Sequence, residues 1–265
     1  MKRRLPIGIQ DFVKIREDGF CYVDKTERIH QLINGSATAC FLSRPRRFGK
    51  SLLCSTLGAI FEGQRELFGE IAGRQALVID SLNWEWKKHP VIKLDLNPGN
   101  YSNGVKELYI TLNRDLELCA KKYGVPFSGE TASDRFARLI FTLKEHFKER
   151  VVVIIDEYDK PLLNTIDNPE LHVEMRSELK NFYGVLKSSD SHLKFVFLTG
   201  VSKFSHVSIF SDLNHLADLT LDPRYADICG MTQEEVEKNF EPEIEGILQE
   251  TRKDRETYLE ELKRF

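Results

Sequence analysis

The run Val151-Val152-Val153-Ile154-Ile155 constrains the fold of this chain more than any other stretch. Five consecutive β-branched residues favour a strand, and a strand that is apolar on both faces belongs inside a sheet covered by helices. Other strand-like runs and the helical patterns between them alternate along the chain, at residues 38–42 (strand), near Lys50 (helix start), 91–96 (strand), 103–123 and 132–149 (helices), 170–187 (helix), 195–198 (strand) and 219–221 (weaker strand). This order predicts an α/β fold of three layers with a mainly parallel five-stranded sheet.

The residues between the first strand and the next helix match the pattern of a phosphate-binding loop, Arg44-Pro45-Arg46-Arg47-Phe48-Gly49-Lys50-Ser51. In such a loop the backbone N–H groups and the positive end of the following helix face bound phosphates. Lys50 is expected to reach the β- and γ-phosphates of ATP, and the Ser51 hydroxyl to bind Mg²⁺. The predicted nucleotide-binding residues in this loop are Arg46, Arg47, Phe48, Gly49, Lys50 and Ser51.

One position departs from the usual G-x-x-x-x-G-K-[ST] pattern, because Arg44 stands where glycine is usual. Glycine at that position would ease a sharp turn. The arginines at positions 44, 46 and 47 would add positive charge beside a polyanion. On this motif alone, an ordinary helix start is an alternative interpretation.

Two carboxylates, Asp156 and Glu157, follow directly on the run of β-branched residues. Carboxylates at the end of a buried strand are costly unless they meet a metal or another partner, and ligands of open α/β sheets bind at that end. We expect Asp156 to hold Mg²⁺ and Glu157 to orient or deprotonate an attacking water, so that Lys50, Asp156 and Glu157 are the predicted catalytic residues. A strand that simply ends in a polar turn is the alternative.

The spacing of these motifs favours a P-loop NTPase with a RecA/AAA-like strand order, because one further strand separates the phosphate loop from the acidic strand. The Asp-Glu pair favours hydrolysis over kinase-type transfer. Thr199 or Ser202, after the fourth strand, is expected to sense the γ-phosphate, although a turn of small residues explains them equally well. Arg224 could reach a phosphate, but a surface salt bridge is the better interpretation.

Composition and charge favour a globular protein with two parts. We expect a nucleotide-binding domain at residues 1–230, with segment 1–36 near the base, and a helical lid or the start of a truncated C-terminal domain at 231–265. Residues 1–50 hold eleven Lys and Arg against five Asp and Glu, a basic balance that suits polyphosphate, nucleic acid or ordinary solvated surface. The five scattered cysteines and the absence of a long apolar run indicate a cytoplasmic protein without membrane segments.

Several motifs taken together resemble the bacterial AAA-ATPase-like family. They are LPIGIQDF (5–12), YVDKT (22–26), RPRRFGKS (44–51), IDEYD (155–159), TGVSKFS (199–205) and LDPRY (221–225). The family's loop also reads R-P-R-R-F-G-K-S, so the resemblance covers the arginine at position 44. It implies an ATP-binding, ATP-hydrolysing module. Members typically carry a C-terminal PD-(D/E)XK nuclease-like domain, so it also implies a nuclease domain or DNA as partner; this sequence has no nuclease core of its own.

Three functional hypotheses follow. The first is a Mg²⁺-dependent ATPase, which could assemble into oligomers. The second is a nucleotide-dependent interaction switch with negligible turnover that binds DNA or a nuclease partner. The third, a kinase-like phosphoryl transferase, is disfavoured by the Asp156-Glu157 pair. The sequence lacks the N-K-x-D motif that reads guanine, which favours ATP over GTP.

Overall fold

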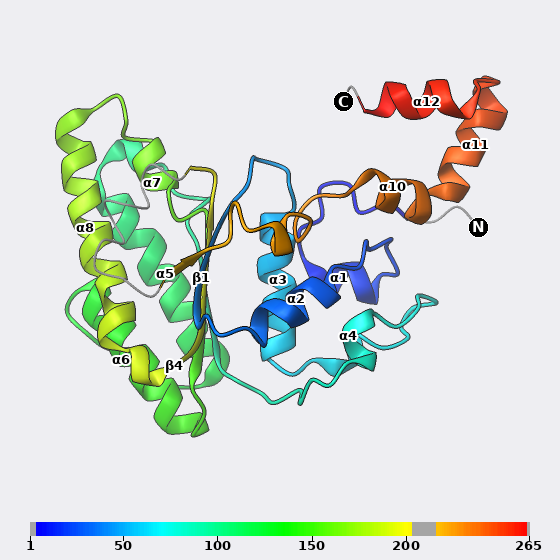
Figure 1. Cartoon of the computed structure of the whole chain (residues 1–265). Coiled ribbons are helices and arrows are strands. Elements are labelled where there is room, and N and C mark those ends of the chain that lie inside the picture. Colours follow the sequence, from blue (N-terminus) through cyan, green and yellow to red (C-terminus); the bar gives the residue numbers. More distant parts are fainter. Residues whose placement is uncertain (1–3, 203–215, 264–265) are drawn as a thin grey trace. The chain divides into compact units, whose positions relative to one another are not determined.

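The structure is a computed structural model that describes residues 4–202 and 216–263 (Figure 1). The chain folds into two units, Met1–Cys229 and Gly230–Phe265. Residues 203–205 of the TGVSKFS motif, which contributes to the family resemblance, lie outside the described residues.

A five-stranded parallel sheet forms the centre of the first unit. Its strands are β1 (Ala39–Ser43), β2 (Val91–Asp95), β3 (Val151–Asp156), β4 (Leu193–Gly200) and β5 (Leu216–Asp218). They lie in the order β2-β3-β4-β1-β5, and every neighbouring pair is parallel. β4 therefore separates β1, which leads into the phosphate loop, from β3, which carries the acidic residues. The predicted fold class and strand order are confirmed.

Helices cover both faces of this sheet, as Figure 1 shows for α5, α6 and α8 on one face and α1, α2 and α3 on the other. The α-helices among the described residues of the first unit are α1 (Phe12–Glu17), α2 (Thr26–Ile33), α3 (Lys50–Phe61), α4 (Val78–Ser81), α5 (Val105–Tyr123), α6 (Ala132–Phe147), α7 (Lys160–Leu163) and α8 (Pro169–Ser188). The predicted helices agree with α3, α5, α6 and α8 to within a few residues.

Two apolar cores lie on opposite sides of the sheet, and β3 contributes to both. All six residues of β3 are buried. Val151, Val153 and Ile155 pack with residues of α5, α6 and α8, whereas Val152 and Ile154 pack with residues of α3. Successive side chains of a strand point to opposite faces, so an unbroken apolar run is what this position requires.

Polar residues at the helix ends explain where the long helices begin and end. The Thr131 side chain accepts a hydrogen bond from the Asp134 amide at the start of α6, and Asn168 does the same for Leu171 at the start of α8. Gly124 ends α5 with a φ of 64°, a left-handed conformation that glycine adopts without a Cβ clash. These local interactions set the ends of the three helices.

The fifth strand differs from its prediction, because β5 lies at Leu216–Asp218 rather than at residues 219–221. The Asp218 carboxylate accepts a hydrogen bond from the Thr220 amide at 2.8 Å, which turns the backbone out of the strand. The Thr220 side chain in turn accepts from the Ser43 amide at 3.1 Å. The polar side chains around the strand end, and not the apolar residues, therefore set its boundary.

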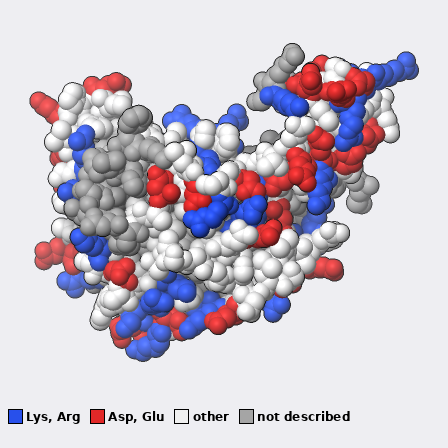
Figure 2. Space-filling model, viewed as in Figure 1, with Lys and Arg blue, Asp and Glu red and all other residues white. Residues whose placement is uncertain are grey.

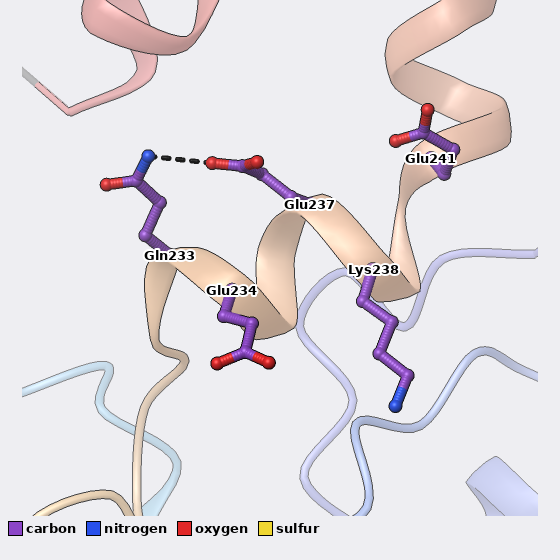
Figure 3. A pocket seen from close by; sticks show the side chains of 5 residues that line it. All are labelled: Gln233, Glu234, Glu237, Lys238 and Glu241. Atoms are coloured by element: carbon purple, nitrogen blue, oxygen red, sulfur yellow. Dashed lines mark hydrogen bonds between the residues drawn. The ribbon is translucent and has the colours of Figure 1, made fainter.

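In the second unit, the residues up to 263 form three helices, α10 (Gln233–Asn239), α11 (Glu241–Thr251) and α12 (Arg255–Leu262). Thr232 is the N-cap of α10, and it forms a capping box with Glu235. Arg255 pairs with Glu241 and Glu245 at 2.6 and 2.8 Å, which joins α12 to α11. Figure 3 shows a shallow hollow along α10 in which acidic side chains and Lys238 project apart, and these side chains form no convergent site.

Charged residues of both signs are interspersed over the face shown in Figure 2, where Lys and Arg lie beside Asp and Glu. Ion pairs on the protein surface include Arg65 with Asp80 and Arg138 with Asp134. Within the described ranges, no helix combines the length and the apolar character that crossing a bilayer requires. The charges outside the phosphate loop on this face have the distribution of solvated surface.

His89 provides a prediction about stability. It is buried before β2, and its Nδ1 lies 2.8 Å from the Arg150 carbonyl oxygen. Burial lowers the pKa of His89 below its usual 6.5; Lys194 and Lys87 lower the pKa further, while the Arg150 contact and Glu149 oppose the shift. The unfolded chain therefore binds this proton more readily than the folded chain, so stability is lost as the pH falls below about 6.5.

We expect His89→Gln to flatten this pH dependence, because glutamine can donate to the Arg150 carbonyl and does not titrate. Urea unfolding at pH 5.5 and pH 7.5 measures the effect. The free energy of unfolding should fall more between these two pH values in the wild-type chain than in the variant. Equal losses in both would show that His89 does not contribute.

Candidate functional site

The loop between β1 and α3 takes its shape from two left-handed residues. Gly49, the N-cap of α3, has a φ of 84°, and Arg47 has a φ of 68°. Arg44 is not among the residues with positive φ, so the backbone at this position has no need of glycine. The departure of Arg44 from the usual pattern therefore leaves the loop geometry intact.

Lys50, the first residue of α3, is 4% exposed and folds back over the loop that precedes it. Its Nζ donates to the Pro45 carbonyl oxygen at 3.2 Å. The same Nζ lies 3.3 Å from Oε1 of Glu157, whose side chain is 18% exposed. This ion pair joins two segments that are far apart in sequence, and it brings the phosphate loop and the acidic strand end to one place.

Asp156 ends β3 and is 8% exposed. Burial raises the pKa of Asp156 to about 6, and the nearby charges of Glu157 and Asp95 act in the same direction. A hydrogen bond from the Ser51 hydroxyl and the charge of Lys50 oppose this shift. Ser51 and Asp156, the two predicted metal ligands, therefore lie near each other at the end of β3.

Glu157 has a φ of 52°, a left-handed conformation that is unusual for a residue other than glycine. Its amide donates to Oδ1 of Asp156 at 3.0 Å, and its side chain pairs with Lys50. Backbone strain of this kind costs about 1 kcal/mol or more and is concentrated at functional sites. The strain here coincides with the residue predicted to act on water.

Thr199 is fully buried near the end of β4 and pairs in register with Leu42 of β1. It shares its side of the strand with Phe197, which packs in the core against α3, so its side chain faces the phosphate-loop side of the sheet. Among the described residues, its hydroxyl Oγ1 has no hydrogen-bond partner. A buried hydroxyl without a partner is costly, and a ligand at the strand end would supply one.

Lys50, Asp156 and Glu157 line a cleft of about 990 Å³. Residues from the segments 8–11, 46–55, 93–97 and 154–163 line it, together with Asp115 of α5. The predicted site residues among them are Arg46, Arg47, Gly49, Lys50, Ser51, Asp156 and Glu157. Phe48 and Thr199 are not part of the lining; the Phe48 side chain is 45% exposed, and Thr199 lies beneath the surface.

The secondary candidates take structural roles. Arg224 pairs with Asp222 at 2.5 Å and its side chain is 73% exposed, which confirms the interpretation as a surface salt bridge. The Ser202 amide donates to the carboxylate of Asp159 at 2.7 Å. Neither Arg224 nor Ser202 lines the cleft.

Sequence reasoning missed several polar residues of the cleft, namely Lys93, Asp95, Asn97, Asp115 and Lys160. Asp95 ends β2 and lies in register with Asp156 on the neighbouring strand β3. The rule that placed Asp156 at the ligand-binding end of the sheet applies equally to Asp95, so a signal was present. Asp115 reaches the cleft by accepting the Asp95 amide at 2.8 Å, a long-range contact with no local signal.

Asp159 is also a residue whose role was not predicted. Its carboxylate is fully buried and accepts the amides of Val201 and Ser202 at 3.1 and 2.7 Å. A Cβ at Gly200 would lie 2.5 Å from this carboxylate, so the close approach requires glycine. Tyr158 adds a bond from its hydroxyl to the Ser202 carbonyl at 2.8 Å. The acidic turn, residues 156–159 at the end of β3, thus holds the end of β4 in place.

We expect Asp159→Ala to destabilise the fold by about 2–4 kcal/mol, because two partly buried amides lose their acceptor. Asp159→Asn retains one acceptor oxygen and should lie between the variant and the wild type. Chemical unfolding measures the loss, with the exposed Asp167→Ala as the control that changes stability little. An Asp159→Ala protein as stable as the wild type would show that these bonds contribute nothing.

Comparison with known proteins places the chain in a family. The family model described as "Predicted AAA-ATPase" matches residues 6–210. This chain belongs to the AAA-ATPase-like family. The matched range of the AAA-ATPase-like protein begins before α1 and includes the phosphate loop, the acidic strand end and all of β4.

The AAA-ATPase-like chain is also similar to a protein of Azotobacter chroococcum mcd 1 that is described as an uncharacterized protein in the vnfD 5′ region. The two are 43% identical over 248 residues, which is 93% of this chain and 46% of the relative. The chain thus spans about half the length of that protein. No solved structure matches this AAA-ATPase-like chain significantly.

Proposed function

We propose that this chain binds ATP together with Mg²⁺ and hydrolyses the γ-phosphate. The observation that carries the proposal is the distance of 3.3 Å between Nζ of Lys50 and Oε1 of Glu157, at the wall of one cleft. A loop suited to phosphates and a carboxylate suited to activating water are therefore within reach of the same ligand.

The phosphates would lie at the N-terminus of α3. The backbone amides of the loop and the positive end of this helix attract anions, and Arg46 and Arg47 add exposed positive charge at the rim of the cleft. Lys50, now held by the Pro45 carbonyl and by Glu157, would turn to the β- and γ-phosphates. Phe48 would contribute its backbone amide, since its side chain does not line the cleft.

The oxygen donors of Ser51 and Asp156 fit Mg²⁺, which prefers oxygen ligands and is commonly bound by one or two protein side chains plus substrate phosphates. The part of the chain that the structure describes contains no group of three or more His, Cys, Asp or Glu side chains suited to a metal. When bound, the ion would neutralise charge that develops on the phosphates.

Glu157 would orient or deprotonate the attacking water. Its carboxylate now faces Lys50, so ATP binding would compete for Lys50 and release the carboxylate for water. The buried Thr199 hydroxyl lies on the same side of the sheet and would donate to the γ-phosphate region. Placing such groups around the phosphates and the water is the main contribution of a protein to phosphoryl transfer.

The N-terminal segment is the proposed site of the base. Residues 8–11 line the cleft, as does Ser55 of α3, whose Oγ accepts the Phe12 amide at 3.0 Å. This contact holds the segment against α3, next to the loop that would bind the phosphates. Adenine is the proposed base because the sequence lacks the motif that reads guanine.

The test is release of inorganic phosphate from ATP or GTP by the purified chain, with Mg²⁺ or with EDTA. Turnover of ATP that requires Mg²⁺ and exceeds that of GTP is the expected result. Binding of ATP without turnover would support the interaction switch instead. We further propose that the nucleotide state regulates a partner of the kind that the family resemblance implies, a nuclease-like domain or DNA.

A further inference from the structure

Arg44 does not face the cleft, although it belongs to the phosphate loop. Its guanidinium donates to the Ser43 and Thr220 carbonyl oxygens, each at 3.0 Å, and to the Tyr225 carbonyl oxygen at 3.1 Å. A fourth contact reaches the Ala226 carbonyl oxygen at 3.5 Å. A planar guanidinium with five N–H donors can span several carbonyls in this way, whereas a lysine cannot.

Three of the four contacts of Arg44 reach residues of the segment 219–229. We call it the closing segment because Cys229 is the last residue of the first unit. Leu219, Tyr225 and Ile228 of this segment are buried in the core beside α3. Their packing fixes the backbone so that its carbonyls face Arg44. The closing segment leads directly in sequence to Gly230, where the second unit begins.

The base of the phosphate loop is also tied to the end of β4. The Arg44 amide donates to the Gly200 carbonyl at 3.2 Å, and the Ser43 hydroxyl donates to the Val201 carbonyl at 2.9 Å. On the other side, the Ser43 amide donates to the Thr220 hydroxyl oxygen at 3.1 Å. Two residues at the loop base therefore connect the strand end beside the acidic turn with the closing segment.

We propose that Arg44 is a positioning residue that couples nucleotide binding in the phosphate loop to the conformation of the closing segment. The inference rests on the proposed binding of ATP and extends it to the regulation of that site. A bound triphosphate would reduce the motion of the phosphate loop. The hydrogen bonds of the Arg44 guanidinium to the carbonyls of residues 220, 225 and 226 would then reduce the motion of the closing segment as well. Because such coupling is reciprocal, a loosened closing segment would weaken ATP binding by the same factor.

Hydrogen exchange of the full chain, measured by mass spectrometry with and without ATP and Mg²⁺, tests the coupling. In the wild type, ATP should slow exchange about fivefold in peptides that cover residues 47–55 and in those that cover the closing segment. In Arg44→Ala, ATP should still slow exchange at residues 47–55 but should no longer slow it in the closing segment. Arg44→Lys keeps the positive charge but lacks the planar guanidinium, so ATP should slow exchange in the closing segment only slightly.

Arg224→Ala is the matched control, since Arg224 lies on the closing segment but pairs with Asp222 and not with the loop. It should keep both effects. If ATP slows exchange at residues 47–55 of the wild type but not in the closing segment, the coupling is wrong and ATP binding stands. If neither region responds, ATP binding itself is wrong. A full response of the closing segment in folded Arg44→Lys and Arg44→Ala would assign Arg44 a merely structural role and overturn the inference.

Discussion

Glu157→Gln should abolish ATP turnover while leaving ATP binding intact. Glutamine has the size of glutamate but cannot accept the proton of the attacking water, and the loss of a general base typically costs about 10²–10⁴-fold in rate. The ion pair between Glu157 and Lys50 must also open when Lys50 turns to the phosphates. Since the variant lacks this pair, it should bind ATP at least as tightly as the wild type. Phosphate release and equilibrium ATP binding, measured on the same preparation, give both quantities.

The matched control for this variant is Glu145→Gln, which removes a glutamate that pairs with Lys144 and Lys148 on the surface of α6. Its turnover and affinity should equal those of the wild type. Unchanged turnover in Glu157→Gln would exclude Glu157 from the reaction. A loss of both binding and turnover would point to a role in holding the nucleotide instead.

Lys50→Ala should weaken ATP binding about 100-fold, equal to about 2.7 kcal/mol, because a buried charge-assisted contact to the phosphates is lost. The buried position of Lys50 makes this contact stronger than one in water, since little solvent separates the charges. Binding of labelled ATP at equilibrium measures the change. Turnover at saturating ATP should fall as well, because the lysine also stabilises charge in the transition state.

Lys122→Ala is a suitable comparison, since Lys122 also pairs with a glutamate, Glu62, but lies outside the cleft. Its ATP affinity should stay within about twofold of the wild type. Equal affinities of Lys50→Ala and Lys122→Ala would remove the phosphate loop from the proposed site.

The parts of the fold that the sequence predicted are those with a local signal. β3 is recognisable from its unbroken run of β-branched residues, and α3 from the Gly49-Lys50-Ser51 start. The convergence of loop and acidic strand also followed, because the carboxyl ends of parallel strands meet at one edge of the sheet. The predicted boundary of β5 was wrong because the Asp218 side chain, and not the apolar pattern, ends that strand.

The long-range contacts of the site could not be predicted. Arg44 was expected to add charge beside a polyanion, yet its partners Thr220 and Tyr225 lie 176 and 181 residues away in sequence. Its position in the loop motif gave no indication of them. The unpartnered hydroxyl of Thr199 likewise depends on the register of β4 with β1, which no local pattern encodes.

Calorimetric titration of the wild-type chain with ATP, once with Mg²⁺ and once with EDTA, tests most directly whether one cleft accepts triphosphate and metal together. We expect a single saturable site per chain in the presence of Mg²⁺, with markedly weaker binding in EDTA because Ser51 and Asp156 then lack the ion that they would share with the phosphates. Absence of binding under both conditions would contradict the account.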